Sequence, residues 1–188
     1  MKGWETRVEK KVRLKERRYE LDQLMKEKRS EEMEALEEVF DKSTLMIIYH
    51  MLNAGELKKI HGVVKAGKEA RLYWGIGPRG KEVAVKIYLT SSTEFRKGKL
   101  VYIEGDQRFS RAKRDTRALV YLWAQKEFKN LEAAQEGGVR VPKPIRVNRN
   151  VLLMEFIGRN GIPAPLLREA ELKNSVRVYR KLLRYLRL

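Results

Sequence analysis

The sequence contains no cysteine, and this absence excludes a disulfide scaffold, a thiolate zinc site and a cysteine nucleophile. Its two histidines, His50 and His61, are too few for a histidine-rich metal centre. No run of about 18 apolar residues is present, so no membrane-spanning helix is predicted. The first residues also lack the apolar core of a signal peptide. We therefore expect a cytoplasmic chain that binds no membrane and contributes no metal site of its own.

Acidic residues are scarce over most of the chain. Among the 188 residues, 42 are Lys or Arg and 25 are Asp or Glu, which gives a net charge of +17. Residues 1–42 hold 12 of each sign and are neutral, whereas residues 43–188 hold 30 basic and 13 acidic residues. Such a surplus favours polyanionic partners such as RNA, ribosomes or nucleotides. The plain alternative is a lysine-rich surface that is merely solvated.

Glycine and proline are absent from residues 5–40, which are rich in Glu, Lys, Arg, Leu and Met. This composition predicts a long charged helix with a narrow apolar stripe, and we interpret residues 1–40 as an arm that is mobile or ordered by a partner. A second helix is predicted to begin at Asp41 or Ser43, either of which can cap it. It should end before Gly55, a residue suited to a left-handed C-terminal position.

Short apolar runs broken by glycine and proline follow, and they predict a β-meander. The expected strands cover residues 60–64, 71–76 and 82–88. A polar, basic loop is predicted over residues 90–117 and an amphipathic helix over 117–135. Two further strands, 139–147 and 150–157, and a last helix that ends near Leu188 complete the prediction. That last helix is basic on one side, so attachment to a membrane surface is a weaker interpretation of residues 174–188.

One lysine and one glutamate stand out in this order of elements, which is that of a protein-kinase N-terminal lobe. Lys86 lies inside the strand segment Val83-Ala-Val-Lys-Ile, where a cation can pair with nucleotide phosphates. Glu127, in the middle of the following helix, is the carboxylate expected to pair with it. The alternatives are a strand lysine whose ammonium reaches water and one more surface carboxylate.

Eight short motifs occur in a fixed order and together resemble the RIO family of atypical serine/threonine kinases and ATPases, in its type-one branch. The resemblance covers roughly residues 41–172. It implies an α+β fold, a kinase-like N-lobe in which a twisted antiparallel sheet carries one long helix, here over residues 41–158, with residues 159–188 beginning an incomplete C-lobe. The motifs are Gly67-Lys-Glu-Ala, Val83-Ala-Val-Lys-Ile-Tyr, Ser92-Thr-Glu-Phe, Gly105-Asp-Gln-Arg-Phe, Trp123-Ala-Gln-Lys-Glu-Phe-Lys-Asn-Leu, Val141-Pro-Lys-Pro, Leu153-Met-Glu-Phe-Ile-Gly and Pro163-Ala-Pro.

The resemblance also implies a role for individual residues. Lys86 would contact the α- and β-phosphates of ATP and pair with Glu127, while the loop that contains Gly67 and Lys68 would cover the phosphates. Met154 would be the gatekeeper, and residues 155–157 the hinge. The remaining implied residues are Glu155 and Ile157, which would hold the adenine edge through a carbonyl and an amide, Val64, Ala84 and Pro144 as pocket walls, and Ser110, in a flexible loop over residues 91–116, as a phosphorylation candidate.

Two family segments are missing from this sequence. The aspartate that accepts the substrate proton lies in His-Gly-Asp-Leu-Ser-Glu-Tyr-Asn, and the Mg²⁺ ligands include a later aspartate; we expect both to follow Leu188 in a longer protein. The resemblance thus implies the ATP-binding part of a kinase or ATPase, dependent on ATP and Mg²⁺, that acts in maturation of the small ribosomal subunit. The 188 residues alone are expected to be inactive. The alternative is a non-catalytic basic module that docks on ribosomal RNA.

Overall fold

The computed structural model describes Leu36, residues 40–90 and residues 115–188. The chain divides after Lys42 into two units, which are described separately. Nearly all of the expected helix over residues 5–40 lies outside the described residues, as do nearly all of the expected loop over 91–116 and the candidate Ser110.

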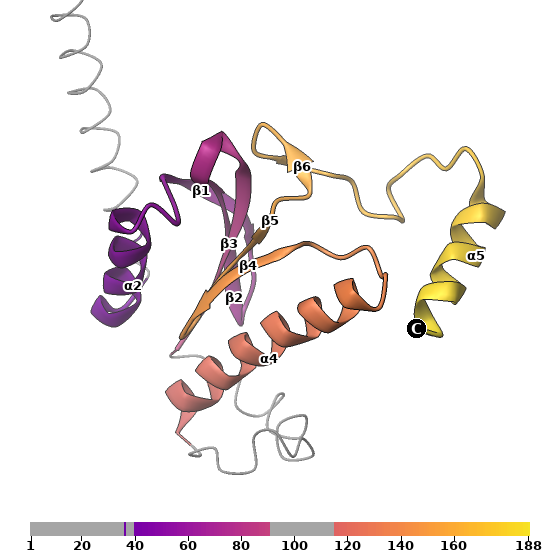
Figure 1. Ribbon diagram of the computed structural model, residues 1–188. Coiled ribbons are helices and arrows are strands. Elements are labelled where there is room, and N and C mark those ends of the chain that lie inside the picture. Colours follow the sequence, from indigo (N-terminus) through magenta and orange to yellow (C-terminus); the bar gives the residue numbers. More distant parts are fainter. Residues whose placement is uncertain (1–35, 37–39, 91–114) are drawn as a thin grey trace, which may run out of the picture. The chain divides into compact units, whose positions relative to one another are not determined.

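A five-stranded antiparallel sheet forms the centre of the second unit, with the strands in the order β1-β2-β3-β5-β4 (Figure 1). The strands come from short apolar runs separated by Gly-containing turns, as the sequence predicts, and the α+β class is confirmed. Their bounds are β1, Lys59–Ala66; β2, Ala70–Ile76; β3, Glu82–Tyr88; β4, Pro144–Asn148; and β5, Val151–Glu155. A short 3₁₀ turn, η1 (Pro78–Gly80), joins β2 to β3.

Helix α4 (Thr116–Glu136) runs along one side of the sheet and contacts β4 and β5 (Figure 1). Its buried side chains are small or medium in size, namely Leu119, Val120 and Ala124. The larger side chains of Trp123 and Phe128 are only partly buried against the core. Small side chains at the centre of the contact let the helix lie close to the sheet.

Helix α2 (Lys42–Asn53) lies on the other side of the sheet (Figure 1). Leu45, Ile47, Ile48 and Met51 are buried, and Leu52 is half-buried. Gly55 follows the helix with a φ of +70°, the left-handed conformation predicted for it. Ser43 lies inside α2 and therefore is not its cap, contrary to one of the two predicted starts.

The chain after α4 differs from the prediction in two ways. Residues 139–143 are not a strand, and Pro142 among them lacks the amide hydrogen that a ladder needs. Strand β4 begins only at Pro144, because a proline is tolerated as the first residue of a strand. Two short strands that were not predicted, β6 (Gly158–Arg159) and β7 (Ile162–Pro163), form a hairpin after β5. The final helix, α5, covers Ser175–Leu186. None of the described helices is long and apolar enough to cross a membrane.

Candidate nucleotide-binding site

Lys86 and Glu127 form a two-pronged ion pair between β3 and α4. The Lys86 ammonium nitrogen Nζ lies 2.8 Å from Oε1 of Glu127 and 2.7 Å from Oε2. Each side chain retains 26% of its exposure, so the pair is shielded but still open to solvent. An ammonium held in this way is fixed in position and can still offer a donor to an anion.

The positions of the two residues follow from simple periodicities. In β3, Glu82, Ala84, Lys86 and Tyr88 point to the same face of the sheet, because side chains alternate along a strand. In α4, Val120, Ala124 and Glu127 follow the spacing i, i+4, i+7 and share the face that packs on the sheet. The same packing that buries the apolar residues therefore turns Glu127 toward Lys86.

Tyr88 is a third member of this cluster, and the sequence analysis assigns it no role in the site. Its hydroxyl donates a hydrogen bond to Oε2 of Glu127, and Lys86 Nζ lies 4.9 Å from the centroid of its ring. Burial, and then the nearby Glu127 charge, raise the pKa of the Tyr88 hydroxyl, which therefore remains a donor. Side chains two residues apart in a strand point to the same face, so the spacing of Lys86 and Tyr88 could have predicted that Tyr88 lies beside the ion pair.

An apolar row crosses the same face of the sheet beside the ion pair. Ala84 pairs with Met154 across β3 and β5, and Met154 pairs with Pro144 across β5 and β4. Ala84 and Pro144 are buried and Met154 is half-buried. These three sequence-predicted pocket residues thus lie side by side. Val64 lies in a bulged part of β1 and is half-buried.

The turn between β1 and β2 contains Gly67 and Lys68. The Gly67 amide donates to the carbonyl of Ala70 at 3.0 Å, which closes the turn. A Cβ at Gly67 would lie 3.1 Å from that same oxygen, so the turn is tight there. Lys68 is exposed at the tip. The predicted phosphate-covering role of this turn stays a prediction.

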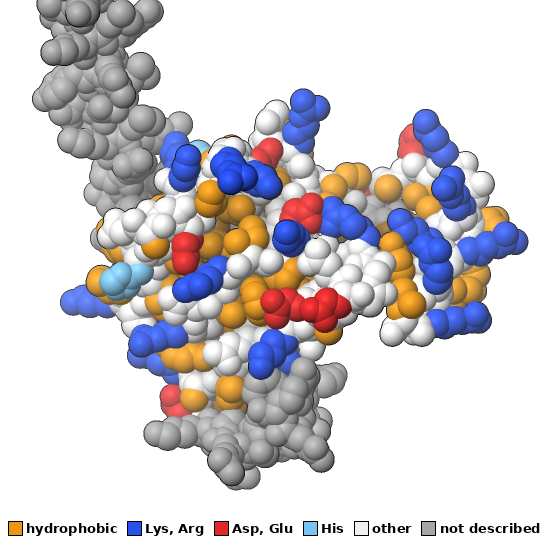
Figure 2. Space-filling model, viewed as in Figure 1, with side chains coloured by type: hydrophobic (Ala, Val, Ile, Leu, Met, Phe, Trp, Pro, Cys, Tyr) orange, Lys and Arg blue, Asp and Glu red, His pale blue; other side chains and the backbone are white. Residues whose placement is uncertain are grey.

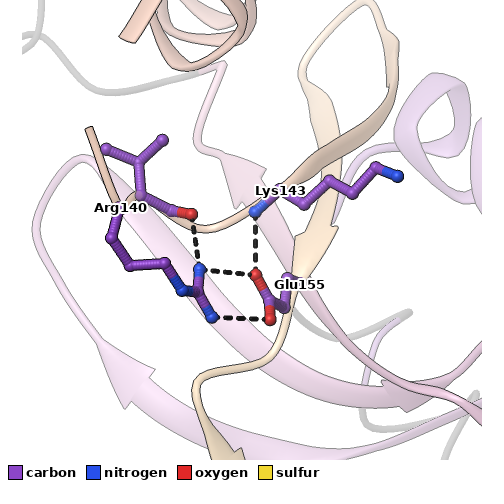
Figure 3. Close-up of polar contacts among 4 residues, drawn as sticks. Arg140, Lys143 and Glu155 are labelled. Atoms are coloured by element: carbon purple, nitrogen blue, oxygen red, sulfur yellow. Dashed lines mark hydrogen bonds and ion pairs between the residues drawn. The ribbon is translucent and has the colours of Figure 1, made fainter. Parts of the chain in front are cut away.

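Glu155, the first residue of the predicted hinge (residues 155–157), is held by several hydrogen bonds. The Arg140 guanidinium donates to both oxygens of Glu155, at 2.9 and 2.8 Å, and also to the carbonyl of Val141 (Figure 3). The backbone amide of Lys143 adds a bond of 3.1 Å to Glu155. Arg140 is the main cause that lowers the pKa of Glu155, so this carboxylate is ionised at neutral pH.

The end of the hinge is more open than its start. Phe156 is buried, whereas Ile157 is 42% exposed and its carbonyl accepts a bond of 2.9 Å from the Ala164 amide. The assignment of Glu155 and Ile157 to adenine is not tested by these contacts and remains a prediction.

Charge and metal-ligating groups complete the description of the site. Lys and Arg side chains are spread widely over the face seen in Figure 2, and several lie on α5. Among the described residues, no group of three or more His, Asp or Glu side chains is arranged to hold a metal ion. The arrangement of these residues is that of a kinase-like N-terminal lobe.

Comparison with known proteins identifies the family. Residues 71–188 match the model of the RIO domain. The RIO-type serine/threonine-protein kinase Rio1 of Haloferax volcanii is 39% identical over 163 residues, which are 87% of this chain and 56% of that protein. Human serine/threonine-protein kinase RIO1 is 36% identical over 156 residues, 81% of this chain and 27% of the human protein. The chain thus spans about half the length of the archaeal relative.

A solved structure supports the fold. The Rio2 kinase of Chaetomium thermophilum, in a complex with ADP/Mg²⁺-phosphoaspartate, matches with a TM-score of 0.54 at 21% identity, over 74% of this chain and 39% of that one. The chain belongs to the RIO family, as the ordered motifs predicted, and its relatives named Rio1 agree with the type-one branch.

Proposed function

We propose that this chain is the ATP-binding part of a RIO-type serine/threonine kinase or ATPase. The observation that supports the proposal most directly is the Lys86–Glu127 ion pair beside the row of Ala84, Met154 and Pro144. A fixed cation next to a flat apolar surface fits the two halves of a nucleotide, its phosphates and its base. The kinase names of the relatives agree with this assignment.

In this proposal each residue of the site has a separate role. Glu127 orients the Lys86 ammonium, and Tyr88 holds Glu127, so that the ammonium can donate to the α- and β-phosphates without a search through rotamers. The turn around Gly67 and Lys68 would cover the phosphates with backbone amides. Ala84, Pro144 and Val64 would enclose the base beside Met154. At the hinge, the carbonyl of Glu155 would accept a hydrogen bond from the edge of the adenine, and the amide of Ile157 would donate one to it.

The family resemblance also implies Mg²⁺, which neutralises phosphate charge when it is bound with ATP. No suitable group of ligands is present among the described residues, so we assign no residue of this chain to the metal. Phosphotransfer also needs a group that accepts the substrate proton, and we assign no such residue here either. We propose nucleotide binding for these residues, and turnover for the longer protein. Ser110 remains a phosphorylation candidate from the resemblance.

The test is nucleotide affinity in Lys86→Met, a variant that keeps the apolar stem and removes the charge. We expect ATP affinity to fall by about tenfold or more, because a charged hydrogen bond to phosphate contributes about 1.5–3 kcal/mol. Lys129→Ala is the matched control, since Lys129 is an exposed lysine on α4. Unchanged ATP affinity in Lys86→Met, with the fold intact, would remove Lys86 from the site.

We also propose that the protein acts in the cytoplasm in maturation of the small ribosomal subunit, with precursor ribosomal RNA as its partner. The resemblance supplies this role, and the charge surplus of residues 43–188 is compatible with it. Helix α5, which has basic but no acidic residues, is one surface that RNA could contact. RNA affinity should then fall steeply with salt, and affinity independent of salt would contradict RNA as a partner.

A further inference from the structure

A second carboxylate, Glu82, lies at the exit of the hinge and gathers three hydrogen bonds. Trp74 Nε1 donates to Glu82 Oε2 at 2.9 Å, and the backbone amides of Asn160 and Gly161 donate to Oε1 and Oε2 at 2.9 and 3.0 Å. The two amides belong to the tip of the β6–β7 hairpin, whereas Glu82 and Trp74 lie on the sheet. The carboxylate therefore ties the hairpin to the sheet.

The indole ring of Trp74 also packs directly against the tip of the β6–β7 hairpin. A Cβ placed on Gly161 would lie 2.8 Å from Trp74 Cε3, so the hairpin tip rests directly on the ring. Gly161 also has a φ of +76°, a conformation that L side chains rarely adopt. His61 stacks on the same indole, with ring centroids 4.1 Å apart and planes inclined by 19°. The position of the tip is thus set by both packing and hydrogen bonds.

This cluster borders the proposed base pocket. Trp74 pairs with Ala84, which pairs with Met154, so Trp74 continues the apolar row by one strand. Val83 pairs with Glu155, which places Glu82 beside the start of the hinge. Arg140 holds the hinge at Glu155, and Glu82 holds the chain that leaves it at residues 160–161. The segment between them is therefore fixed at both ends.

We infer that Glu82 is a positioning residue that, by fastening the β6–β7 hairpin to the sheet, sets the hinge backbone at Ile157 and so the selectivity of the site for adenine. This inference rests on the proposed function, because it assigns a nucleotide base to the hinge. Glu82 itself need not touch the nucleotide. Trp74 and Gly161 take part as the surface against which the hairpin is held.

Selectivity is the property that separates this role from simple stabilisation. Adenine offers an amino donor next to a ring acceptor, whereas guanine offers a carbonyl acceptor in place of the amino group. A carbonyl and an amide at fixed positions on the hinge therefore accept adenine and leave guanine with unpaired polar groups. If the hinge backbone is held less firmly, its carbonyl and amide bind adenine less well and exclude guanine less strictly. ATP affinity then falls, while GTP affinity changes less.

The experiment uses two variants that disturb the contact by unrelated means. Glu82→Gln keeps an oxygen acceptor but replaces the other oxygen by an amide nitrogen, which cannot accept from the hairpin. Gly161→Ala leaves every charge in place and pushes the hairpin from the indole. Their matched controls are Glu132→Gln, at an exposed position of α4, and Gly55→Ala, where φ is +70° and no heavy atom lies within 4 Å of the new Cβ.

Dissociation constants for ATP and GTP are measured on each 188-residue variant, together with amide hydrogen exchange over residues 157–164 without nucleotide. We expect both test variants to weaken ATP binding by about three- to tenfold, the effect of about one hydrogen bond, and to narrow the ATP-to-GTP preference. Exchange over residues 157–164 should become faster in both. The control variants should keep the wild-type preference and exchange.

The outcomes distinguish the inference from the function on which it rests. If the wild-type chain does not bind ATP, the proposed function fails for this chain, and hydrogen exchange alone then decides whether Glu82 holds the hinge. If the wild type prefers ATP and both test variants keep that preference, the positioning role is wrong while the proposed function stands. Equal losses for ATP and GTP would also overturn it, because they indicate general destabilisation.

Discussion

The hydroxyl of Tyr88 donates to the same Glu127 carboxylate that pairs with Lys86, so two side chains of one strand hold one side chain of α4. The buried phenol joins the apolar core to the ion pair, since its ring packs with Val120 and Leu152. A carboxylate held by two donors has fewer orientations than one held by a lysine alone. The cation is thereby placed before any nucleotide arrives.

Tyr88→Phe tests this arrangement, because it removes one hydroxyl and keeps the buried ring. We expect a loss of about 1 kcal/mol in the free energy of unfolding, which is below the usual range for a hydrogen bond to a charged group because Glu127 is partly exposed. ATP affinity should fall less than in Lys86→Met. The burial that raises the pKa of Tyr88 keeps its hydroxyl protonated, so the difference should be constant between pH 6 and 9. Urea denaturation across that range measures it, and a loss that vanishes above pH 8 would contradict it.

A second prediction concerns Asn150, which is fully buried in the turn between β4 and β5. Its Nδ2 donates to Thr44 Oγ1 of α2 and to the carbonyl of Tyr88, both at 2.9 Å. Asn150→Ala leaves the two acceptors without this donor, and we expect a loss of about 2–3 kcal/mol in unfolding free energy. Combining it with Thr44→Ala should give less than the sum of the two losses. Strict additivity in urea denaturation would show that this hydrogen bond contributes nothing.

A third prediction is a pH effect at the hinge. Arg140 lowers the pKa of Glu155 in the folded protein below its unfolded value, so the stabilisation is present above the unfolded pKa and is lost as pH falls through the folded one. Because the side chain of Arg140 is 58% exposed and that of Glu155 is 36% exposed, we expect Arg140→Ala to cost only a small part of the free energy of unfolding at pH 7. The cost should shrink toward zero in acid and in 1 M salt. Thermal unfolding at pH 7 and pH 3.5 tests the sign, and a larger cost in acid would contradict it.

The sequence predicted the parts of this fold that depend on local patterns. The strand motif around Lys86 and the position of Glu127 in the middle of the following helix predicted the ion pair that the two residues form. The partners that come from distant segments were missed. Glu82, Trp74 and Arg140 acquire their roles only through the β6–β7 hairpin and the loop before β4.

These missed contacts share a physical reason. Strands of two residues, such as β6 and β7, are too short to show a period, and their position is set by tertiary bonds to Glu82. The motif Gly158-Arg-Asn-Gly161 is a turn signal, but a turn signal does not name the surface on which the turn rests. Pro142 lies inside the run predicted as a strand from residue 139, although it has no amide hydrogen to donate to the ladder.

The last prediction concerns Gly75, the last but one residue of β2. A Cβ there would meet the carbonyl oxygen of Lys59 at 2.9 Å, Leu57 Cδ1 at 3.1 Å and Val85 Cγ2 at 3.2 Å. The neighbouring backbone of β1 cannot move away without loss of ladder bonds, so we expect Gly75→Ala to cost about 1–3 kcal/mol. Gly62→Ala in β1 is the matched control, because no heavy atom lies within 4 Å of its new Cβ. That variant should be neutral or slightly stabilising, since alanine restricts the unfolded chain. Urea denaturation of the pair measures the difference, and equal stabilities would show that β1 and β2 adjust freely at this crossing.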